Sequence, residues 1–452
     1  MKIPFSQNLK GLQKALDTPL YAVGGCVRDF ILSGKLSNDV DLTANLSVEE
    51  FSSAARARGF KLLSSNPLTL SVAFTDGEFK YEWTAFRKEK CESSGYHTPV
   101  LVERTDSINE DAQRRDFKCN AVYYRLSDDL ICDPVGGLCD IENKVLNTVR
   151  EPKTTFAEDG LRLLRLARFC GELGFEIGKE TLEGARALAK NVNALSHERV
   201  FAELQRILVA DTAHGFSPKD GHYRALKALD EILVLDEILP ELTRGRGMIQ
   251  RLEWHKYDVL EHSLRAVLYA DEGVRLAALL HDIGKPECML ETGKYRGHEA
   301  VGERLAKDVL SRFNVSKTTV YEVVRLIGLH MLDLDGKTSV KKLRRVFVDN
   351  ADIFEKLLSL KQADFMAGRD GNGVSPCVTK WRAVFADMVA NGVPWTVKDL
   401  EISATELKEL GLSGKQIGEF LREMHKLCII RPTENDRDRL LQRAKKLLTK
   451  SK

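Results

Sequence analysis

Two aspartates separated by one residue are the first feature of the chain that indicates chemistry. Asp39 and Asp41 lie in the apolar stretch DVDLTA. Side chains alternate on a β-strand, so the two carboxylates would face one side while Val40 and Leu42 enter the core on the other. Like charges this close are tolerated in solvent or around a divalent cation, and carboxylates suit Mg²⁺. The pair therefore predicts either a magnesium site or a solvated edge strand.

A pair of glycines precedes the aspartates. Gly24 and Gly25 end the apolar stretch PLYAV, and a helix is expected to open at about Val27. Glycine at such a turn lets a phosphate approach the backbone, and a helix N-terminus attracts anions. Arg28 falls in the first helical turn, where the helix dipole disfavours a cation. A phosphate ligand would explain this arginine, although pairing with Asp29 would also do so.

A second region gathers histidines, since half of the ten histidines fall between His255 and His330. Imidazole and carboxylate together suit transition metals, so the adjacent His281–Asp282 pair indicates a metal site. The arrangement resembles the HD superfamily of metal-dependent phosphohydrolases. By this resemblance the ligands are His262, His281, Asp282 and Asp364, with His298 and His330 as ligands of a second metal or contacts to phosphate. The alternative is an HD fold kept as a scaffold without turnover.

The elements that must position these residues divide the chain in two. Apolar periodicity predicts helices over FSQNLKGLQKAL and VRDFIL, and strands over PLYAVGG, DVDLTA, LTLSVAF and FKYEWTAFRK. From about Thr155 onward the helical period persists to the C-terminus. We therefore expect a head of strands and helices followed by a long helical remainder.

Composition narrows the class of protein. A chain of 452 residues is too long for one core and predicts three or four domains. The net charge is only +2, so any nucleic acid must be bound through local basic patches. Nine scattered cysteines without a CxxC pair fit reduced thiols in a cytosol. We find no N-terminal signal and no apolar run long enough to span a bilayer, and so expect a cytoplasmic protein without a membrane partner.

The stretch GGCVRDFILSGKLSNDVDL resembles the signature of class II tRNA nucleotidyltransferases and bacterial poly(A) polymerases, in the DNA polymerase β superfamily. RRDFKCNAV, DPVGGLCDIENKVLNTV, EDGLRLLRLARF and SHERVFAEL are similar, in order, to the later motifs of that family. The resemblance implies an α+β fold with a polymerase-β-like head, a mixed sheet with helices, over residues 1–147. An all-helical neck (148–250), an HD domain (251–370) and a helical tail (371–452) would follow.

The resemblance also implies roles for residues. Asp39 and Asp41 would hold two Mg²⁺ ions, one lowering the pKa of an RNA 3′-hydroxyl and the other binding the triphosphate, so that in-line attack releases pyrophosphate. Glu82 is a candidate for a third carboxylate. The nucleotide-binding residues would be Gly25, Arg28, Arg115, Asp116, Asn120, Glu158, Asp159, Arg162, Arg165 and Arg168. For Asp116, a structural ion pair with a neighbouring arginine is the alternative.

The motif EDGLRLLRLARF gives a physical account of base choice. Its Asp159 and the arginines that follow step by three residues along a helix. Cytosine and adenine each present an amine donor beside a ring-nitrogen acceptor, which a carboxylate and a guanidinium can pair with. Guanine and uracil present the reverse pattern. One Asp–Arg pair can therefore admit CTP and ATP without a template, whereas the alternative is a helix laced with surface ion pairs.

These observations predict an enzyme that adds CCA from CTP and ATP to the 3′ end of tRNA. The alternatives are a poly(A) polymerase, a CC- or A-adding enzyme, an HD phosphohydrolase with a non-catalytic nucleotide-binding head, and a non-catalytic tRNA-binding protein. The expected cofactors are Mg²⁺ in the head and Ni²⁺, Mn²⁺ or Co²⁺ in the HD domain. Asn147 and the loop KEKCESSGYHTP depart from the family pattern in segments associated with switching from CTP to ATP.

Overall fold

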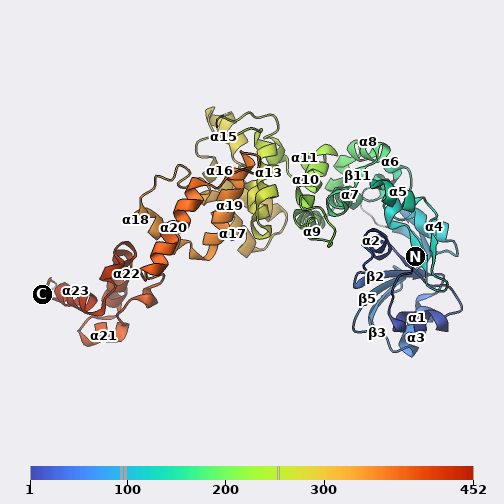
Figure 1. The fold of residues 1–452 in the computed structure, drawn as a ribbon, viewed down its shortest axis with the longest axis horizontal. Helices are drawn as coiled ribbons and strands as arrows, with labels where there is room; N and C mark the ends of the chain where they lie inside the picture. The colour runs from blue at the N-terminus through green and yellow to red at the C-terminus, as the bar shows by residue number, and fades with distance from the viewer. Residues whose placement is uncertain (1, 92–94, 96–98, 252, 254, 451–452) are drawn as a thin grey trace. The chain divides into compact units, whose positions relative to one another are not determined.

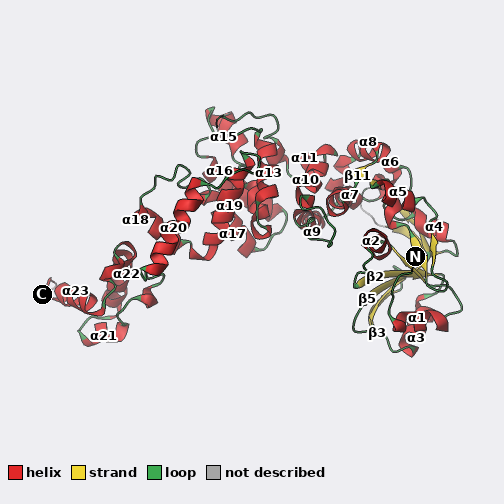
Figure 2. Ribbon diagram, viewed as in Figure 1, coloured by secondary structure: helices red, strands yellow, loops and turns green. Residues whose placement is uncertain are grey.

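The chain forms two compact units in the computed structural model, which describes residues 2–91, 95, 99–251, 253 and 255–450. Unit 1 comprises Met1–Thr243 with Arg312–Asn314, and unit 2 comprises Arg244–Ser311 with Val315–Lys452. The strands gather in unit 1, whereas unit 2 is built of helices (Figure 1 and Figure 2). The mixed sheet with helices and the helical remainder predicted from the sequence are confirmed.

Unit 1 is organised around a seven-stranded mixed sheet with the strand order β3-β4-β5-β2-β1-β8-β9. Strands β2 and β5 run parallel, and the other neighbours in this sheet are antiparallel. The strands are β1 Tyr21–Val23, β2 Asp39–Ala44, β3 Lys61–Asn66, β4 Ser71–Thr75, β5 Lys80–Ala85, β6 Arg87–Cys91, β7 Pro99–Arg104, β8 Tyr123–Arg125, β9 Leu130–Cys132, β10 Val145–Leu146 and β11 Glu176–Ile177. Strands β10 and β11 form a short parallel pair that reaches into the region expected to be helical.

Helices complete both units. Those of unit 1 are α1 Gln7–Ala15, α2 Gly25–Ser33, α3 Val48–Ala57, α4 Ile108–Gln113, α5 Gly137–Asn143, α6 Pro152–Glu158, α7 Leu161–Leu173, α8 Lys179–Ala187, α9 His197–Leu208, α10 Gly221–Glu231, α11 Val234–Ile238 and α12 Pro240–Thr243. Those that follow are α13 Val259–Tyr269, α14 Arg275–Leu280, α15 Lys285–Thr292, α16 His298–Arg312, α17 Lys317–Leu329, α18 Val340–Asp349, α19 Phe354–Ala367, α20 Pro376–Ala390, α21 Ala404–Glu409, α22 Gly414–Ile430 and α23 Arg437–Lys450.

Strand β2 alternates between core and solvent, as the sequence predicts. Val40 and Leu42 are buried, whereas Asp39 and Asp41 are exposed. On the core side of the neighbouring strand β5, the ring of Trp83 stacks on Phe51 of α3 with centroids 4.2 Å apart. Such aromatic burial contributes to a firm core beneath the sheet. The sheet therefore presents the two carboxylates on a rigid surface.

Helix α7 is fixed in unit 1 by a close approach to α10. A Cβ atom added at Gly171 would lie 2.3 Å from the carbonyl oxygen of Gly221, and one added at Gly221 would lie 2.7 Å from the carbonyl oxygen of Gly171. Both distances are too short for any side chain, so the two glycines let the helix backbones touch. This contact matters for the site, because α7 carries the arginines of the motif EDGLRLLRLARF.

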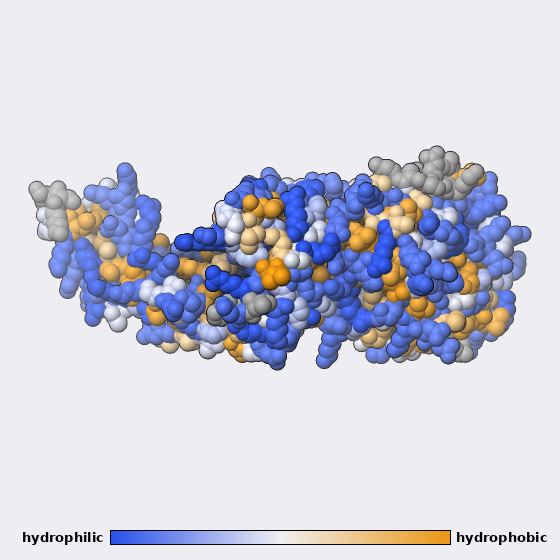
Figure 3. Space-filling model, turned by 90° about the horizontal axis from the view of Figure 1, so that it is seen from above, coloured by the Kyte–Doolittle hydropathy of each residue, from blue (hydrophilic) through white to orange (hydrophobic). Residues whose placement is uncertain are grey.

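None of the helices in the described part of the chain has the length and apolar character needed to cross a membrane. The face of the molecule seen in Figure 3 is mostly hydrophilic, with apolar residues scattered across it.

We expect Gly171→Ala to lower the free energy of unfolding of unit 1 by about 1–3 kcal/mol, because the added methyl group overpacks the α7–α10 contact. Gly215→Ala is the matched control, since a Cβ atom there meets nothing within 4 Å. Both changes restrict the unfolded chain alike. Urea unfolding followed by circular dichroism would measure the difference, and equal midpoints for the two variants would contradict the proposed role of the contact.

Candidate active sites

The first site lies where strands β2 and β5 run side by side. Asp41 and Glu82 are direct partners in the parallel register, so their side chains lie on the same face of the sheet. Asp39, two residues before Asp41, shares that face. Glu82, the candidate for a third carboxylate, therefore lies beside the two aspartates. Three carboxylates offer only oxygen ligands, and such a set fits Mg²⁺.

The two glycines of the turn before α2 differ in whether packing within the protein requires a glycine. Gly24 has a φ of 81°, and a Cβ atom there would lie 2.9 Å from Oδ2 of Asp41. Its missing side chain thus makes room for the carboxylate. At Gly25, by contrast, an added Cβ atom would meet only ordinary contacts with Arg28 and Asp29, at 3.7 and 3.9 Å. Packing within the protein does not require glycine at Gly25, which leaves space beside the backbone.

The carboxylates of this face repel one another. Desolvation by surrounding protein atoms raises the pKa of Asp41 above its ordinary value, although the side chain keeps contact with solvent. Arg115 opposes this rise in pKa, while Glu82 and Asp39 add to it. A cation placed among the three carboxylates would relieve the repulsion. The electrostatics of the site therefore fit a divalent metal ion.

A buried chain of polar contacts leads from the turn to helix α7. Arg28 donates from Nε to Oδ1 of Asp29 at 2.7 Å and from Nη1 to Oδ1 of Asn120 at 2.6 Å. Asn120 in turn donates to Oδ1 of Asp116 at 3.1 Å. Oδ2 of Asp116 accepts from Nε and Nη2 of Arg165 at 2.8 and 2.6 Å. The pairing of Arg28 with Asp29 and an ion pair of Asp116, both considered from the sequence, are thus present.

Asp116 pairs with the distant Arg165 rather than with the arginines beside it in the sequence. Burial alone would raise the pKa of the Asp116 carboxyl, but Arg165 and Asn120 hold that pKa well below its usual range. The neighbouring Arg115 instead donates to the hydroxyl of Tyr123 at 3.0 Å and pairs with Asp111 at 3.3 Å. Arg115 still adds positive charge near Asp41.

The stripe of charged residues on α7 divides into two groups. Arg162 donates from Nη1 to the carbonyl of Thr155 at 3.2 Å and from Nη2 to the carbonyl of Arg114 at 2.7 Å. Glu158, which pairs with Arg150, lies 3.6 Å from Arg162. These contacts hold the Arg162 guanidinium against the segment that carries Arg115 and Asp116.

Arg168 faces elsewhere. Its Nε donates to Oε2 of Glu203 on α9 at 2.7 Å, and its Nη1 donates to Oε1 of Glu172 at 3.0 Å. All three side chains are buried. A guanidinium between two buried carboxylates stabilises the fold by pairing their charges. The structure thus brings Asp116, Arg162 and Arg165 together and directs Arg168 toward α9.

Asn147 follows strand β10 and contacts helix α5 and the residue after β11. Its Nδ2 donates to Oδ1 of Asp140 on α5 at 2.9 Å, and an added Cβ atom at Gly178 would clash with its Oδ1 at 1.9 Å. Asn147 thus packs closely against Gly178, which follows β11. Much of the other divergent segment, the loop KEKCESSGYHTP, lies outside the described residues, which omit 92–94 and 96–98.

The second site lies in unit 2, where four histidines converge on one carboxylate. Nε2 of His281 lies 3.2 Å from Oδ2 of Asp282, and Nε2 of His298 lies 3.2 Å from Oδ1. Nε2 of His262 lies 3.6 Å from Oδ2, and Nε2 of His330 lies 3.7 Å from Oδ1. Asp282 thus belongs to two groups of three whose ligand atoms all lie within 4.8 Å of one another, with His262 and His281 on one side and His298 and His330 on the other.

Asp364 completes the first of these groups. Its Oδ1 lies 3.0 Å from Nε2 of His262 and 3.7 Å from Nε2 of His281. Burial alone would raise the pKa of Asp282 and that of Asp364, but the surrounding imidazoles hold both well below the usual range. Two oxygens and two nitrogens that face one point suit a transition metal. The donor set therefore fits a metal in each group, with Asp282 shared between them.

Helix ends assemble this site from distant parts of the sequence. His262 lies on α13, His281 and His330 follow the last residues of α14 and α17, and Asp364 lies on α19. His298 opens α16, whose first turn touches Gly284. A Cβ atom at Gly284 would lie 2.2 Å from the carbonyl oxygen of His298. Glycine at this position therefore brings His298 close to the His281–Asp282 pair.

Sequence reasoning missed some neighbours of the second site and gave another a different role. Lys285, for which the sequence suggested a contact to phosphate, is buried and donates to Oδ2 of Asp282 and Oε1 of Gln250, both at 2.6 Å. Lys361, also buried, donates to the backbone carbonyl of His330 at 2.7 Å. His255 lies against His262, and burial lowers the pKa of His255 to about 3. No spacing or motif in the sequence indicates Gln250 or Lys361, whereas His255 belongs to the histidine-rich region that the sequence does show.

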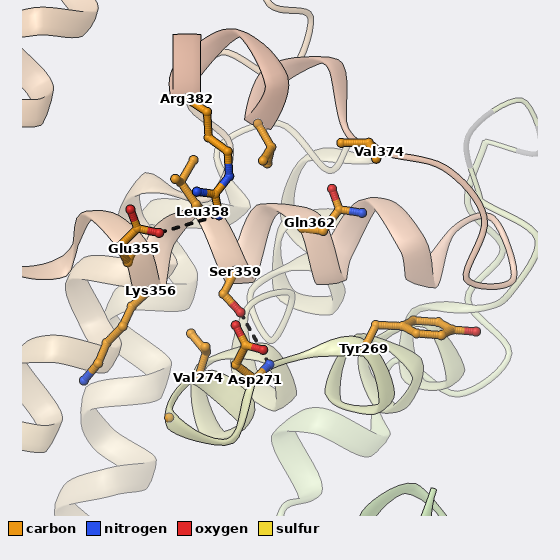
Figure 4. A pocket seen from close by; sticks show the side chains of 12 residues that line it. Tyr269, Asp271, Val274, Glu355, Lys356, Leu358, Ser359, Gln362, Val374 and Arg382 are labelled. Atoms are coloured by element: carbon orange, nitrogen blue, oxygen red, sulfur yellow. Dashed lines mark hydrogen bonds and ion pairs between the residues drawn. The ribbon is translucent and has the colours of Figure 1, made fainter. Parts of the chain in front are cut away.

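A separate surface groove of about 480 Å³ lies on the same unit (Figure 4). Helix α19 contributes Glu355, Leu358, Ser359 and Gln362 to this groove, while Asp364 projects from the opposite side of the helix. Arg382 reaches toward Glu355 at 3.6 Å. The groove is therefore separate from the metal-binding cluster.

Comparison with known proteins identifies both regions. Residues 20–147 match the family model of the poly A polymerase head domain, residues 174–245 match a probable RNA and SrmB-binding site of polymerase A, and residues 259–357 match the HD domain. The chain resembles solved structures in fold. A Bacillus stearothermophilus CCA-adding enzyme in complex with CTP matches at a TM-score of 0.68 and 23% identity over 100% of both chains. A Thermotoga maritima CCA-adding enzyme complexed with tRNA matches at a TM-score of 0.58 and 17% identity, over 96% of this chain and 93% of that chain.

Two curated relatives extend over most of the chain. A multifunctional CCA protein of Xylella fastidiosa is 32% identical over 432 residues, which cover 89% of this chain and 94% of the relative. An A-adding tRNA nucleotidyltransferase of Deinococcus radiodurans is 30% identical over 359 residues, 77% of this chain and 76% of the relative. With its glycine turn, paired aspartates and arginine-bearing helix in the family's order, the chain belongs to the tRNA nucleotidyltransferase and poly(A) polymerase family, and it carries an HD domain.

Proposed function

We propose that this enzyme adds CCA to the 3′ end of tRNA, using CTP and ATP and two Mg²⁺ ions in the head. The observation that carries the proposal is the set of three carboxylates on adjoining strands, Asp39, Asp41 and Glu82, beside the glycine turn. Relatives named for CCA addition and for A addition both support transfer of nucleotides to tRNA. Incubating the protein with tRNA transcripts ending before CCA, after C and after CC, with each nucleotide triphosphate singly, tests which of these additions occurs.

The residues around the carboxylates have separate parts in this proposal. When bound, Mg²⁺ would activate the RNA 3′-hydroxyl and neutralise the triphosphate. Gly25 leaves the backbone open to a phosphate at the N-terminus of α2, where the helix dipole favours an anion. Arg115 supplies positive charge next to Asp41. Arg28 and Asn120 hold the turn in place through their hydrogen bond.

Base choice rests on Asp159 and Arg162 in this proposal. The Arg162 guanidinium is held by two backbone carbonyls, which fix its plane and leave other N–H groups of the fork for a base. Asp159 lies two residues before the first residue of α7, and its Oδ1 accepts from the backbone N–H of Leu161 at 2.9 Å. A carboxylate and a guanidinium held rigidly at one helix end can accept from the amine of cytosine or adenine and donate to its ring nitrogen. This complementarity to both bases favours CCA addition over the addition of a single base.

We expect Asp41→Asn to abolish nucleotide addition and leave the fold intact, because it removes a charge from an exposed position and keeps the side-chain shape. Metal ions supply several kcal/mol of transition-state stabilisation, so the rate should fall by about 10³-fold or more. Glu82→Gln should also slow addition. The exposed Glu49→Gln is a control for loss of one negative charge. Wild-type rates in Asp41→Asn with Mg²⁺ as the sole metal would refute the assignment.

We expect Asp159→Ala to weaken discrimination against UTP and GTP, because the carboxylate that accepts from the amine of cytosine or adenine is lost. Loss of one good bidentate contact costs about 1–3 kcal/mol, or about 5- to 150-fold in selectivity. The ratio of CTP to UTP incorporation into a tRNA lacking CCA measures the effect. Arg168→Gln, further along α7, serves as the comparison, because it should reduce stability by unpairing Glu203 and Glu172 while leaving this ratio unchanged. A ratio unaffected by Asp159→Ala would place selection elsewhere.

A second activity is favoured by the cluster in unit 2. We propose that the HD domain binds transition-metal ions through His262, His281, Asp282 and Asp364, with His298 and His330 in the second group, and hydrolyses a phosphoester. The bound metals would supply Lewis acidity for attack on phosphorus. The observation behind this proposal is the convergence of four Nε2 atoms on the two oxygens of Asp282. Lys285 is already occupied by Asp282 and Gln250, so we assign it to holding Asp282 rather than to phosphate.

We expect replacement of both His281 and Asp282 by Ala to remove the bound transition metal and the hydrolysis of 2′,3′-cyclic or terminal phosphates. Nucleotide addition should change little, because the two centres share no residue. Metal content by elemental analysis and hydrolysis assays with Ni²⁺, Mn²⁺ and Co²⁺ test this. His425→Ala, a histidine outside the cluster, should leave the metal content unchanged. If the wild-type protein binds none of these metals and hydrolyses none of these esters, the proposed activity is wrong and the domain serves as a scaffold.

A further inference from the structure

The second ring nitrogen of each clustered histidine has a partner of its own. In three of the four histidines, Nδ1 faces the backbone carbonyl of the residue three positions earlier. These contacts are Nδ1 of His281 to the oxygen of Ala278 at 2.7 Å, Nδ1 of His298 to the oxygen of Tyr295 at 2.7 Å, and Nδ1 of His330 to the oxygen of Ile327 at 2.6 Å. A carbonyl oxygen can only accept, so Nδ1 of each ring must carry the proton. In a neutral ring protonated in this way Nε2 keeps its lone pair, and in all three rings Nε2 faces Asp282.

His262 is the exception among the four. Its Nδ1 lies 3.4 Å from Nδ1 of His255, and the two rings are 4.6 Å apart at an interplanar angle of 86°. An imidazole, unlike a carbonyl, can either accept or donate. On its other side, Nε2 of His262 lies 3.0 Å from Oδ1 of Asp364, which can only accept. Without an acceptor at Nδ1, the proton of a neutral His262 would therefore reside on Nε2 and point at Asp364.

The place of the proton decides whether His262 can bind a metal. Nε2 coordinates a cation only through its lone pair, so the proton must lie on Nδ1. We propose that His255 is a positioning residue for the metal site. Its Nδ1 accepts the Nδ1–H of His262 and so selects the tautomer that presents the Nε2 lone pair to the centre. This inference rests on the metal-binding function proposed for the HD domain.

The segment around His255 is anchored so that its ring can serve this purpose. Lys256 pairs with Asp370 at 2.6 Å, and the hydroxyl of Tyr257 donates to the same carboxylate. Asp258 caps α13 by accepting from the backbone N–H of Glu261 at 2.7 Å, and its other oxygen accepts from the N–H of Gly247 at 2.7 Å. Helix α13 carries His262 one turn beyond this cap. The anchored segment therefore fixes the ring of His255 relative to that of His262.

The first test measures the tautomer in the metal-free full-length protein. His255→Leu removes the acceptor, whereas His255→Asn, similar in size to leucine, restores an oxygen near the position of Nδ1. With ¹⁵N-labelled histidine, and His262→Gln for assignment, NMR should show a larger share of His262 protonated at Nδ1 in the wild type and in His255→Asn than in His255→Leu, where no acceptor at Nδ1 competes with Asp364 at Nε2. A tautomer that is the same in all three proteins would overturn the inference, whether or not the centre binds metal.

The second test measures metal affinity by calorimetric titration of the same proteins with Ni²⁺. Loss of such an outer-shell partner typically weakens metal binding by about 10- to 100-fold. We expect a loss of this size in His255→Leu and an affinity within about threefold of the wild type in His255→Asn, with equal thermal midpoints. Unchanged affinity in His255→Leu would contradict the positioning role. Absence of binding by the wild type would instead refute the function proposed for the HD domain, while the tautomer measurement would still decide the role of His255.

Discussion

A buried charge must be paired, and this constraint arranges both centres of the protein. In unit 1 the buried or half-buried arginines near the sheet have protein carboxylates as partners, as in the pairs Arg28–Asp29, Arg165–Asp116 and Arg168–Glu203. An unpaired charge in such surroundings would cost several kcal/mol. The carboxylates of β2 and β5 are different, because they lie mainly beside one another. The fold thus pairs its interior charges but gathers negative ones on one face of a strand pair, and such a face suits a cation.

The need to pair buried charges also gives different partners to arginines that look alike in the sequence. Arg162, Arg165 and Arg168 repeat every three residues, but a helix turns by 3.6, so the side chains drift around the axis. The drift sends Arg165 to Asp116 and Arg168 to Glu203, on different neighbours of α7. Of these three arginines, Arg168 thus stabilises the packing of helices, whereas Arg162 and Arg165 contact the segment around Asp116. The equal spacing conceals this difference.

Much of the fold and of both centres could be predicted because local rules act on them. Alternation placed Val40 and Leu42 inside and the two aspartates outside, and β2 begins and ends at the residues of DVDLTA. What could not be predicted depends on long-range register. Glu82 lies beside Asp41 only because β5 joins β2 in parallel, and Asn120 reaches Arg28 across 92 residues. The hydrogen-bond partner of His262 is of the same kind, since ring orientation in a cluster follows from packing and not from spacing.

The two centres differ in how firmly their ligands are held, and this bears on the metals they suit. The carboxylates of the head are carried by a strand pair and remain open to solvent, as suits an ion that keeps water and shares substrate phosphates. In the HD domain the imidazoles are buried and their second nitrogens have partners, which are backbone carbonyls for three rings and the ring of His255 for the fourth. Ligands held in advance lose little freedom on binding and retain an ion tightly. The head would therefore suit an exchangeable metal, and the HD domain would suit one that stays bound.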